Sequence, residues 1–173
     1  QTAYEIHRCL ECRRVLFRSV PVYIEIDNGM NRTGVAPGEP TLELAQKIES
    51  TKHVTLAGIM GYEGQVLDIK PLAKKREQCH KALALLVETH ELLTANGIEV
   101  HIVSAGGTGC YPITVAYPGI TELQAGGGIF MDLFYKEECL IEDLKLALTV
   151  VTTVGSRHDQ HIRLNRSEKR RGR

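Results

Sequence analysis

The sequence lacks the features that mark several large classes of protein. It contains no tryptophan and only 5% aromatic residues, and its 21 basic and 21 acidic side chains leave no net charge. A surface that binds nucleic acid through excess charge is therefore not indicated. No apolar run approaches the roughly 20 residues that a membrane-spanning helix needs. We expect neither a nucleic acid nor a membrane as a partner.

Cysteine is present without the spacing of a disulfide framework. The five cysteines are scattered along the chain, and the first residues lack the basic-then-apolar pattern of a secretory signal. We therefore predict reduced thiols and a cytoplasmic protein. Cys9 and Cys12 form a single CxxC pair with no second pair to complete four ligands, so they predict no metal site.

Charge is distributed unevenly between the ends and the middle of the chain. Arginines crowd residues 13–18, and residues 155–173 contain few side chains that could join a core. The stretches "RRVLFRS" and "RSEKRRGR" also resemble translated sequencing-adapter DNA, with genuine basic tails as the alternative. We predict that residues 1–19 are a non-native or disordered flank and that residues 155–173 are a disordered basic tail.

The middle of the chain alternates between strand-like and helix-like segments. Apolar, β-branched runs predict strands, whereas apolar residues at three- and four-residue steps predict helices. We expect strands over residues 20–27, 54–62, 98–105 and 121–125, and helices over residues 40–50 and 71–96. Apolar strands that alternate with helices predict an α/β fold with a parallel sheet covered on both faces. At about 30 residues per βα unit this is half of an eight-stranded barrel, with an open doubly wound sheet as the alternative.

Two successive strand ends are rich in glycine: "GGTG" follows the third expected strand and "GGG" follows the fourth. Backbone N–H groups can converge on an anion only where no Cβ atom blocks the approach, and a threonine hydroxyl adds a donor. Simple turns are the alternative, but two such loops at neighbouring strand ends favour a phosphate site. No GxxxxGK[ST] motif is present, which excludes a P-loop. We predict a phosphate cradle made of Gly107, Thr108, Gly109, Gly126 and Gly127.

Five motifs follow one another in an order that resembles one group of enzymes: "VYIEIDNGMNRTGV", "GIMGYEGQ", "VSAGGTGCY", "GITELQAGGGIFMD" and "LALTVVTTV". They are similar to the D-threonine aldolase and D-serine dehydratase group of fold-type III pyridoxal-phosphate enzymes, relatives of alanine racemase. The resemblance covers about residues 20–154. It implies a (β/α)8 barrel that binds pyridoxal 5′-phosphate, with residues 20–140 as its C-terminal half (strands 5–8) and residues 141–154 as the start of a β domain.

The same resemblance implies roles for individual side chains. Arg32 is expected near the ring face and phenolic oxygen of the cofactor, Tyr62 on the substrate side of the ring, and Gln124 opposite the pyridine nitrogen, while the two glycine-rich loops bind the phosphate. A neutral Gln124 predicts a less electron-withdrawing ring than a carboxylate partner would give. The triplet "GGG" stands where the family often has Gly-Ser-Tyr.

Two parts of the family's machinery are absent from these motifs. The resemblance implies a lysine that forms a Schiff base with the cofactor at the end of the barrel's first strand, and none of the expected strands ends in lysine. It also places a divalent metal in the C-terminal β domain, and His158 and His161 do not match those metal ligands. We expect the lysines of the middle region to be solvated, on loops or on a helix face: Lys52, Lys70, Lys74, Lys75 and Lys81.

We therefore predict a fragment of a pyridoxal-phosphate-dependent lyase that acts on D-β-hydroxy amino acids, of the D-threonine aldolase or D-serine dehydratase type. The chain alone is expected to be inactive, and the full-length parent is expected to be a homodimer. Three alternatives remain at this point: a non-catalytic barrel that carries the cofactor, an amino-acid racemase of the same fold, and an unrelated phosphate-binding barrel enzyme.

Overall fold

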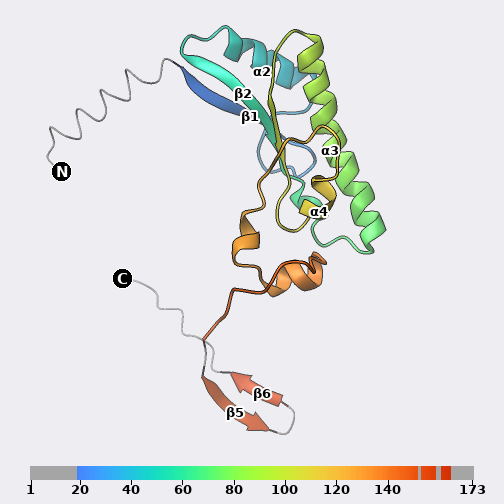
Figure 1. Cartoon of the computed structure of the whole chain (residues 1–173), viewed down its shortest axis with the longest axis vertical. Helices are drawn as coiled ribbons and strands as arrows, with labels where there is room; N and C mark the ends of the chain where they lie inside the picture. Colours follow the sequence, from blue (N-terminus) through green and yellow to red (C-terminus); the bar gives the residue numbers. More distant parts are fainter. Residues whose placement is uncertain (1–18, 152, 159–160, 165–173) are drawn as a thin grey trace, which may run out of the picture.

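The computed structural model describes residues 19–151, 153–158 and 161–164. Its main sheet has four parallel strands in the order β1-β2-β3-β4 (Figure 1). The parallel α/β class predicted from the sequence is confirmed, and each strand lies within its expected range. Most of the predicted flanks, residues 1–18 and 165–173, lies outside the described residues. The strands are β1 (Val20–Ile26), β2 (Val54–Gly61), β3 (Ile102–Ala105) and β4 (Glu122–Leu123).

The two long helices, α2 (Glu39–Glu49) and α3 (Leu72–Ala95), pack against the same face of this sheet and against each other (Figure 1). Helix α3 ends where Gly97 adopts a φ of 76° and the N–H groups of Gly97 and Ile98 bond back to Thr94 and Leu93. The buried apolar core lies between the helices and the sheet. It includes Ile24, Ile26, Leu42, Ala45, Leu56, Ile59, Leu83, Leu86, Leu93, Val103 and Ala105.

The opposite face of the sheet differs from the expectation that helices cover both faces. In the described part of the chain no helix lies over it. One row of neighbouring residues crosses this face in register: Glu25, Met60, Ser104 and Glu122. The expectation was wrong because the strands are not apolar on both sides; β1, for example, buries Ile24 and Ile26 but turns Glu25 away from them.

Strand β2 contains an irregularity that changes which side chains face the helices. Val22 of β1 pairs with Leu56, but the next residue, Tyr23, pairs with Gly58, so Ala57 is an extra residue. A bulge of this kind reverses the alternation of the strand beyond it. Leu56 and Ile59, three residues apart, are consequently both buried in the core.

Short helical turns follow the strands at the edge where their carboxyl ends lie. They are η1 (Gly64–Val66) after β2, α4 (Tyr111–Thr114) after β3, and η2 (Gly126–Ile129) and η3 (Phe134–Glu138) after β4. No helix in the described part of the chain is long and apolar enough to cross a membrane.

The described C-terminal part contains a segment without strands, followed by a hairpin. Residues 146–151 form no strand, and instead the N–H groups of Ala147 and Leu148 bond to the carbonyl oxygens of Phe130 and Met131. Strands β5 (Val154–His158) and β6 (His161–Leu164) pair as an antiparallel hairpin, which lies, apart from Val154, in the segment expected to be a disordered tail. The expectation rested on side-chain composition, whereas a hairpin satisfies backbone groups whatever the charge of its side chains.

Candidate functional site

An open hollow of about 230 Å³ lies at the carboxyl ends of the four strands. This edge is where parallel α/β folds bind their ligands. Of the predicted site residues only Gly109 is missing from its lining. The hollow is lined by Glu25, Arg32, Met60, Gly61, Tyr62, Gly106, Gly107, Thr108, Gln124, Gly126, Gly127 and Tyr135.

The loop after β3 offers unpaired donors to this hollow. Gly106 adopts a φ of 81°, which favours glycine, and its N–H donates to Glu63 Oε2 at 3.2 Å. Among the described residues, the N–H groups of Gly107, Thr108 and Gly109 donate to no acceptor. The hydroxyl of Thr108 is buried and also has no hydrogen-bond partner. A buried polar atom without a partner is costly, so this loop fits an anion such as a phosphate group.

Close packing requires the glycines of this loop. A Cβ atom on Gly107 would lie 2.8 Å from Tyr62 Cε2. One on Gly109 would lie 2.5 Å from Leu67 Cδ2 and 2.8 Å from Cys139 Sγ, far inside van der Waals contact. The side of Gly109 on which a Cβ atom would stand therefore faces the neighbouring loops, and Gly109 is not part of the lining.

The loop after β4 is more open. A Cβ atom on Gly126 would meet no atom within 4 Å, and one on Gly128 would come no closer than 3.3 Å to a side chain of the protein. Gly127 is confined on one side by the hydroxyl of Tyr135, 2.6 Å from an added Cβ atom. Gly126 thus leaves free space beside the unpaired donors of the loop after β3.

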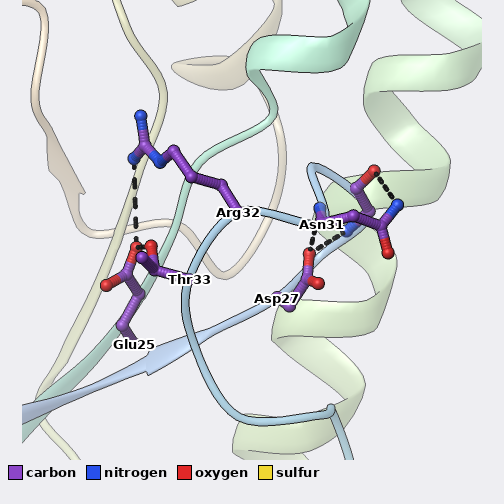
Figure 2. Close-up of polar contacts among 6 residues, drawn as sticks. Glu25, Asp27, Asn31, Arg32 and Thr33 are labelled. Atoms are coloured by element: carbon purple, nitrogen blue, oxygen red, sulfur yellow. Dashed lines mark hydrogen bonds and ion pairs between the residues drawn. The ribbon is translucent and has the colours of Figure 1, made fainter.

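Arg32 and Tyr62 lie together on one side of the hollow. The guanidinium of Arg32 lies 5.4 Å from the centre of the Tyr62 ring, within the range of a cation–π contact. Figure 2 shows Arg32 reaching toward Glu25, at 4.0 Å, while Thr33 donates to the same carboxylate oxygen at 2.6 Å. Burial raises the pKa of the Tyr62 phenol, with the positive charge of Arg32 acting in the opposite direction. The phenol is therefore protonated at neutral pH.

A tight turn presents Arg32 to the hollow. The Asp27 carboxylate accepts the N–H groups of Gly29 at 3.1 Å and of Asn31 at 2.9 Å (Figure 2). Asn31 has a φ of 54°, a left-handed conformation that asparagine tolerates better than most residues. The bonds from Asn31 and Gly29 lower the pKa of Asp27, because they stabilise its charged form.

Gln124 is oriented by a short chain of hydrogen bonds. Its Nε2 donates to Ser104 Oγ at 2.9 Å, and the Ser104 hydroxyl donates to Glu122 Oε1 at 2.6 Å. A carboxylate can only accept hydrogen bonds, so the Ser104 hydroxyl donates its hydrogen to Glu122. The oxygen of that hydroxyl accepts the hydrogen bond from the Gln124 amide. The carbonyl oxygen of Gln124 is thereby left for another donor.

Glu63 is a buried site residue that the sequence did not reveal. Its Oε1 accepts hydrogen bonds from Thr114 Oγ1 at 2.6 Å and from Cys110 Sγ at 3.0 Å, in addition to the bond from Gly106 to Oε2. A hydrogen bond with Cys79, burial and the charge of Glu63 raise the pKa of Cys110, so its thiol stays protonated. The only local signal was a carboxylate next to Tyr62, which does not distinguish a buried glutamate from an exposed one.

Lys75 contradicts its prediction as a solvated lysine. It is 1% exposed, and its Nζ donates to the carbonyl oxygens of Leu67 at 2.9 Å, Gly109 at 2.7 Å and Cys139 at 2.9 Å. Burial lowers its pKa from the ordinary lysine value. Its position four residues before the buried Cys79, on the apolar stripe of α3, was the available signal.

Neither a lysine nor a metal cluster is found at the hollow. None of the residues that line it is a lysine. Within residues 19–151, 153–158 and 161–164, no three His, Cys, Asp or Glu side chains come together in a way that could hold a metal ion.

Comparison with known families identifies the fold. Residues 2–133 match the model of the alanine racemase N-terminal domain. The chain belongs to this family. The matched range begins inside the segment that the sequence analysis assigned to a flank.

Curated relatives from this family are lyases. The chain is 34% identical over 113 residues to the D-threonine aldolase of an Arthrobacter species, a match that covers 65% of the chain and 30% of the relative. It is 29% identical over 148 residues to the 3-hydroxy-D-aspartate aldolase of Paracoccus denitrificans, covering 82% of the chain and 38% of the relative. The chain therefore spans about a third of the length of these relatives.

Solved structures with similar folds include enzymes with the same names as these relatives or related names. The D-threonine aldolase from Filomicrobium marinum superposes with a TM-score of 0.74 at 26% identity, over 85% of this chain and 41% of that one. The D-threo-3-hydroxyaspartate dehydratase from Delftia sp. HT23 gives 0.66 at 27% identity, over 83% and 38%. An alanine racemase from Clostridium difficile, at 18% identity over 66% and 30% and a TM-score of 0.52, shares the fold.

Proposed function

We propose that the chain is the C-terminal half of a pyridoxal-phosphate-binding barrel, strands 5–8, from a lyase that acts on D-β-hydroxy amino acids. Two features favour a barrel over an open doubly wound sheet. Helices α2 and α3 lie on one face, whereas a doubly wound sheet carries helices on both. The strands also follow one another in chain order, without the reversal that defines a doubly wound sheet.

The domain limits form part of the proposal. Residues 20–140 would belong to the barrel and residues 141–154 to the start of a β domain, with residues 1–19 and 155–173 as flanks. The remaining strands, the metal site and the lysine that binds the cofactor would belong to the rest of a longer parent, which we propose is a homodimer.

One observation carries the cofactor assignment. The buried Thr108 hydroxyl and the N–H groups of Gly107, Thr108 and Gly109 are all unpaired within the described part of the chain, beside the open space at Gly126. A phosphate group supplies acceptors for all of them. The geometry of the loop therefore supports binding through the phosphate of pyridoxal 5′-phosphate.

The other lining residues suit the rest of that molecule. Gln124 offers a neutral amide oxygen, Arg32 offers a positive charge, and the protonated Tyr62 phenol holds a proton at the mouth of the hollow. The bound cofactor would supply the electron sink for cleavage at the substrate's α-carbon. Arg32 and Tyr62 would contact cofactor or substrate, with Tyr62 moving a proton to or from the reacting atoms.

The substrate class comes from the relatives. Their names specify D-threonine and 3-hydroxy-D-aspartate, both D-amino acids with a β-hydroxyl group. We propose that the full-length parent acts on the same class of small substrate. A parent that acted equally on L-amino acids, or on D-amino acids without a β-hydroxyl, would contradict this.

Titration of the purified chain with pyridoxal 5′-phosphate tests the cofactor assignment. We expect a saturable change in cofactor absorbance, at least about tenfold weaker in Thr108→Val, because a charge-assisted hydrogen bond is lost. Borohydride treatment is expected to trap no adduct at a unique lysine. Absence of saturable binding, or a single trapped lysine, would contradict the proposal.

A further inference from the structure

Lys75 joins three separate segments of the chain. Its three donors bond to Leu67 in the loop after β2, to Gly109 in the loop after β3, and to Cys139 beyond β4. Each of these stretches also lines the hollow: Tyr62 comes from the stretch after β2 and Thr108 from the stretch after β3. Gly126 and Tyr135 come from the stretch after β4. Lys75 itself is not part of the lining. It therefore fixes the spacing of the loops without occupying the hollow.

Lys75 forms no ion pair among the described residues, although the more distant Asp68 carboxylate acts on its charge. Within the described residues no carboxylate oxygen lies within 4.0 Å of its Nζ, although the side chain is 1% exposed. A buried ammonium without a counter-ion is costly even when carbonyl oxygens solvate it. Glu63, a buried carboxylate of the loop after β2, bonds to Gly106 and Cys110, on either side of the stretch that Lys75 binds at Gly109.

The loop after β3 is thus held by two buried side chains, with Glu63 bonded to Gly106 and Cys110 and Lys75 bonded to the Gly109 carbonyl oxygen. Between Gly106 and Cys110 lie the unpaired N–H groups of Gly107, Thr108 and Gly109. A dianion held there would add negative charge near Lys75, which forms no ion pair among the described residues. The effect would be strong because charges interact more strongly in a buried environment than in water.

We propose that Lys75 is a positioning residue of the phosphate cradle, which holds the Gly109 end of the loop in place and supplies the positive charge behind it. This inference rests on the proposed function, since it takes the phosphate of the cofactor to lie on this loop. Lys75 acts through the Gly109 peptide and does not touch the ligand. It is distinct from the lysine that would bind the cofactor covalently.

The experiment separates this role from a merely structural one by comparing two ligands. Pyridoxine 5′-phosphate and pyridoxine differ only in the phosphate, and neither carries the aldehyde that modifies lysines. Their affinities for the chain are measured by calorimetry in wild type, Lys75→Met and Lys81→Met. Lys81 is a matched control, because it lies on the same helix but is exposed and paired with Glu77 at 2.7 Å.

In wild type we expect pyridoxine 5′-phosphate to bind more tightly than pyridoxine. Lys75→Met is expected to reduce this preference by about tenfold or more, as for loss of a charged group at a buried anion site. Its affinity for pyridoxine should change by less than about twofold, and Lys81→Met should match wild type in both. A purely structural loss would weaken both ligands together and would overturn the inference.

The possible failures are distinguishable. A wild-type chain that does not prefer the phosphate ester overturns the proposed function and this inference with it. A preference that is equal in wild type and Lys75→Met overturns the inference alone.

Amine acetylation of the wild-type chain gives a second measurement that does not depend on the folding of a variant. Pyridoxine 5′-phosphate should slow acetylation of Lys75 but not of Lys81, because a ligand that binds the closed loop suppresses its opening. Equal rates at Lys75 with and without the phosphate ester would contradict the inference.

Discussion

Glycine has different roles at Gly107 and Gly109, in the loop after β3, and at Gly126, in the loop after β4. In the loop after β3, an added Cβ atom at Gly107 or Gly109 would collide with side chains of neighbouring segments. In the loop after β4, Gly126 has no neighbour within 4 Å that would resist a side chain. Glycine is needed in the first loop so that the protein can pack against itself, whereas at Gly126 it leaves space. Sequence composition does not distinguish these roles.

The largest effect is expected from Gly109→Ala. The new methyl group would lie 2.5 Å from Leu67 Cδ2 and 2.8 Å from Cys139 Sγ, and relief of this overlap must move segments that Lys75 ties together. We expect the free energy of unfolding to fall by about 2–3 kcal/mol, measured by urea denaturation. The matched control, Gly126→Ala, should change it by less than about 0.5 kcal/mol. Similar losses in the two variants would contradict the proposed difference between Gly109 and Gly126.

A smaller, opposite effect is expected from Thr108→Val. Its buried hydroxyl has no partner, so replacement by a methyl group should leave the free energy of unfolding unchanged or raise it by up to about 1 kcal/mol. Thr114→Val is the control, because the Thr114 hydroxyl donates to Glu63 at 2.6 Å, and it should cost about 1–3 kcal/mol. Thermal or urea unfolding without ligand provides the measurement. A loss in Thr108→Val as large as that in Thr114→Val would show that the Thr108 hydroxyl is already paired.

The smallest effect is expected at the exposed turn before Arg32. Because the folded-state pKa of Asp27 lies below its ordinary value of 3.8, the charged carboxylate stabilises the turn above that pH. This contribution is lost as the pH falls through the lowered pKa. Asp27→Asn should therefore be slightly less stable than wild type at neutral pH, and the difference should shrink on acidification. Urea midpoints across the acid range measure it, with Glu43→Gln on the exposed face of α2 as the control for net charge. A difference that does not vary with pH would contradict this account.

The sequence predicted most of the scaffold because the decisive signals are local. Periodic apolar residues located α2 and α3, and Asn96-Gly97 located the end of α3. The residues expected at the hollow were predicted from the glycines at two strand ends and from motifs that follow the order seen in a known enzyme group. All but Gly109 line it, and Gly109 packs behind it. The roles assigned to these residues stay predictions.

The residues that the sequence did not reveal are those whose role depends on distant contacts. Lys75 binds a carbonyl oxygen 34 residues away and another 64 residues away, and Glu63 binds a hydroxyl 51 residues away. A charged residue is ordinarily solvated, so local composition predicts the wrong environment for both.

The bulge in β2 determines on which face of the sheet each following residue of the strand lies. Had the strand continued in the phase of Leu56, then Met60 and Tyr62 would have followed Leu56 toward the helices and Ile59 would have faced the opposite side. The single extra residue, Ala57, exchanges these positions. Ile59 is buried in the core, and Met60 and Tyr62 reach the hollow. Ala57, which does not line the hollow, thus determines which residues of "GIMGY" are buried in the core and which line the site.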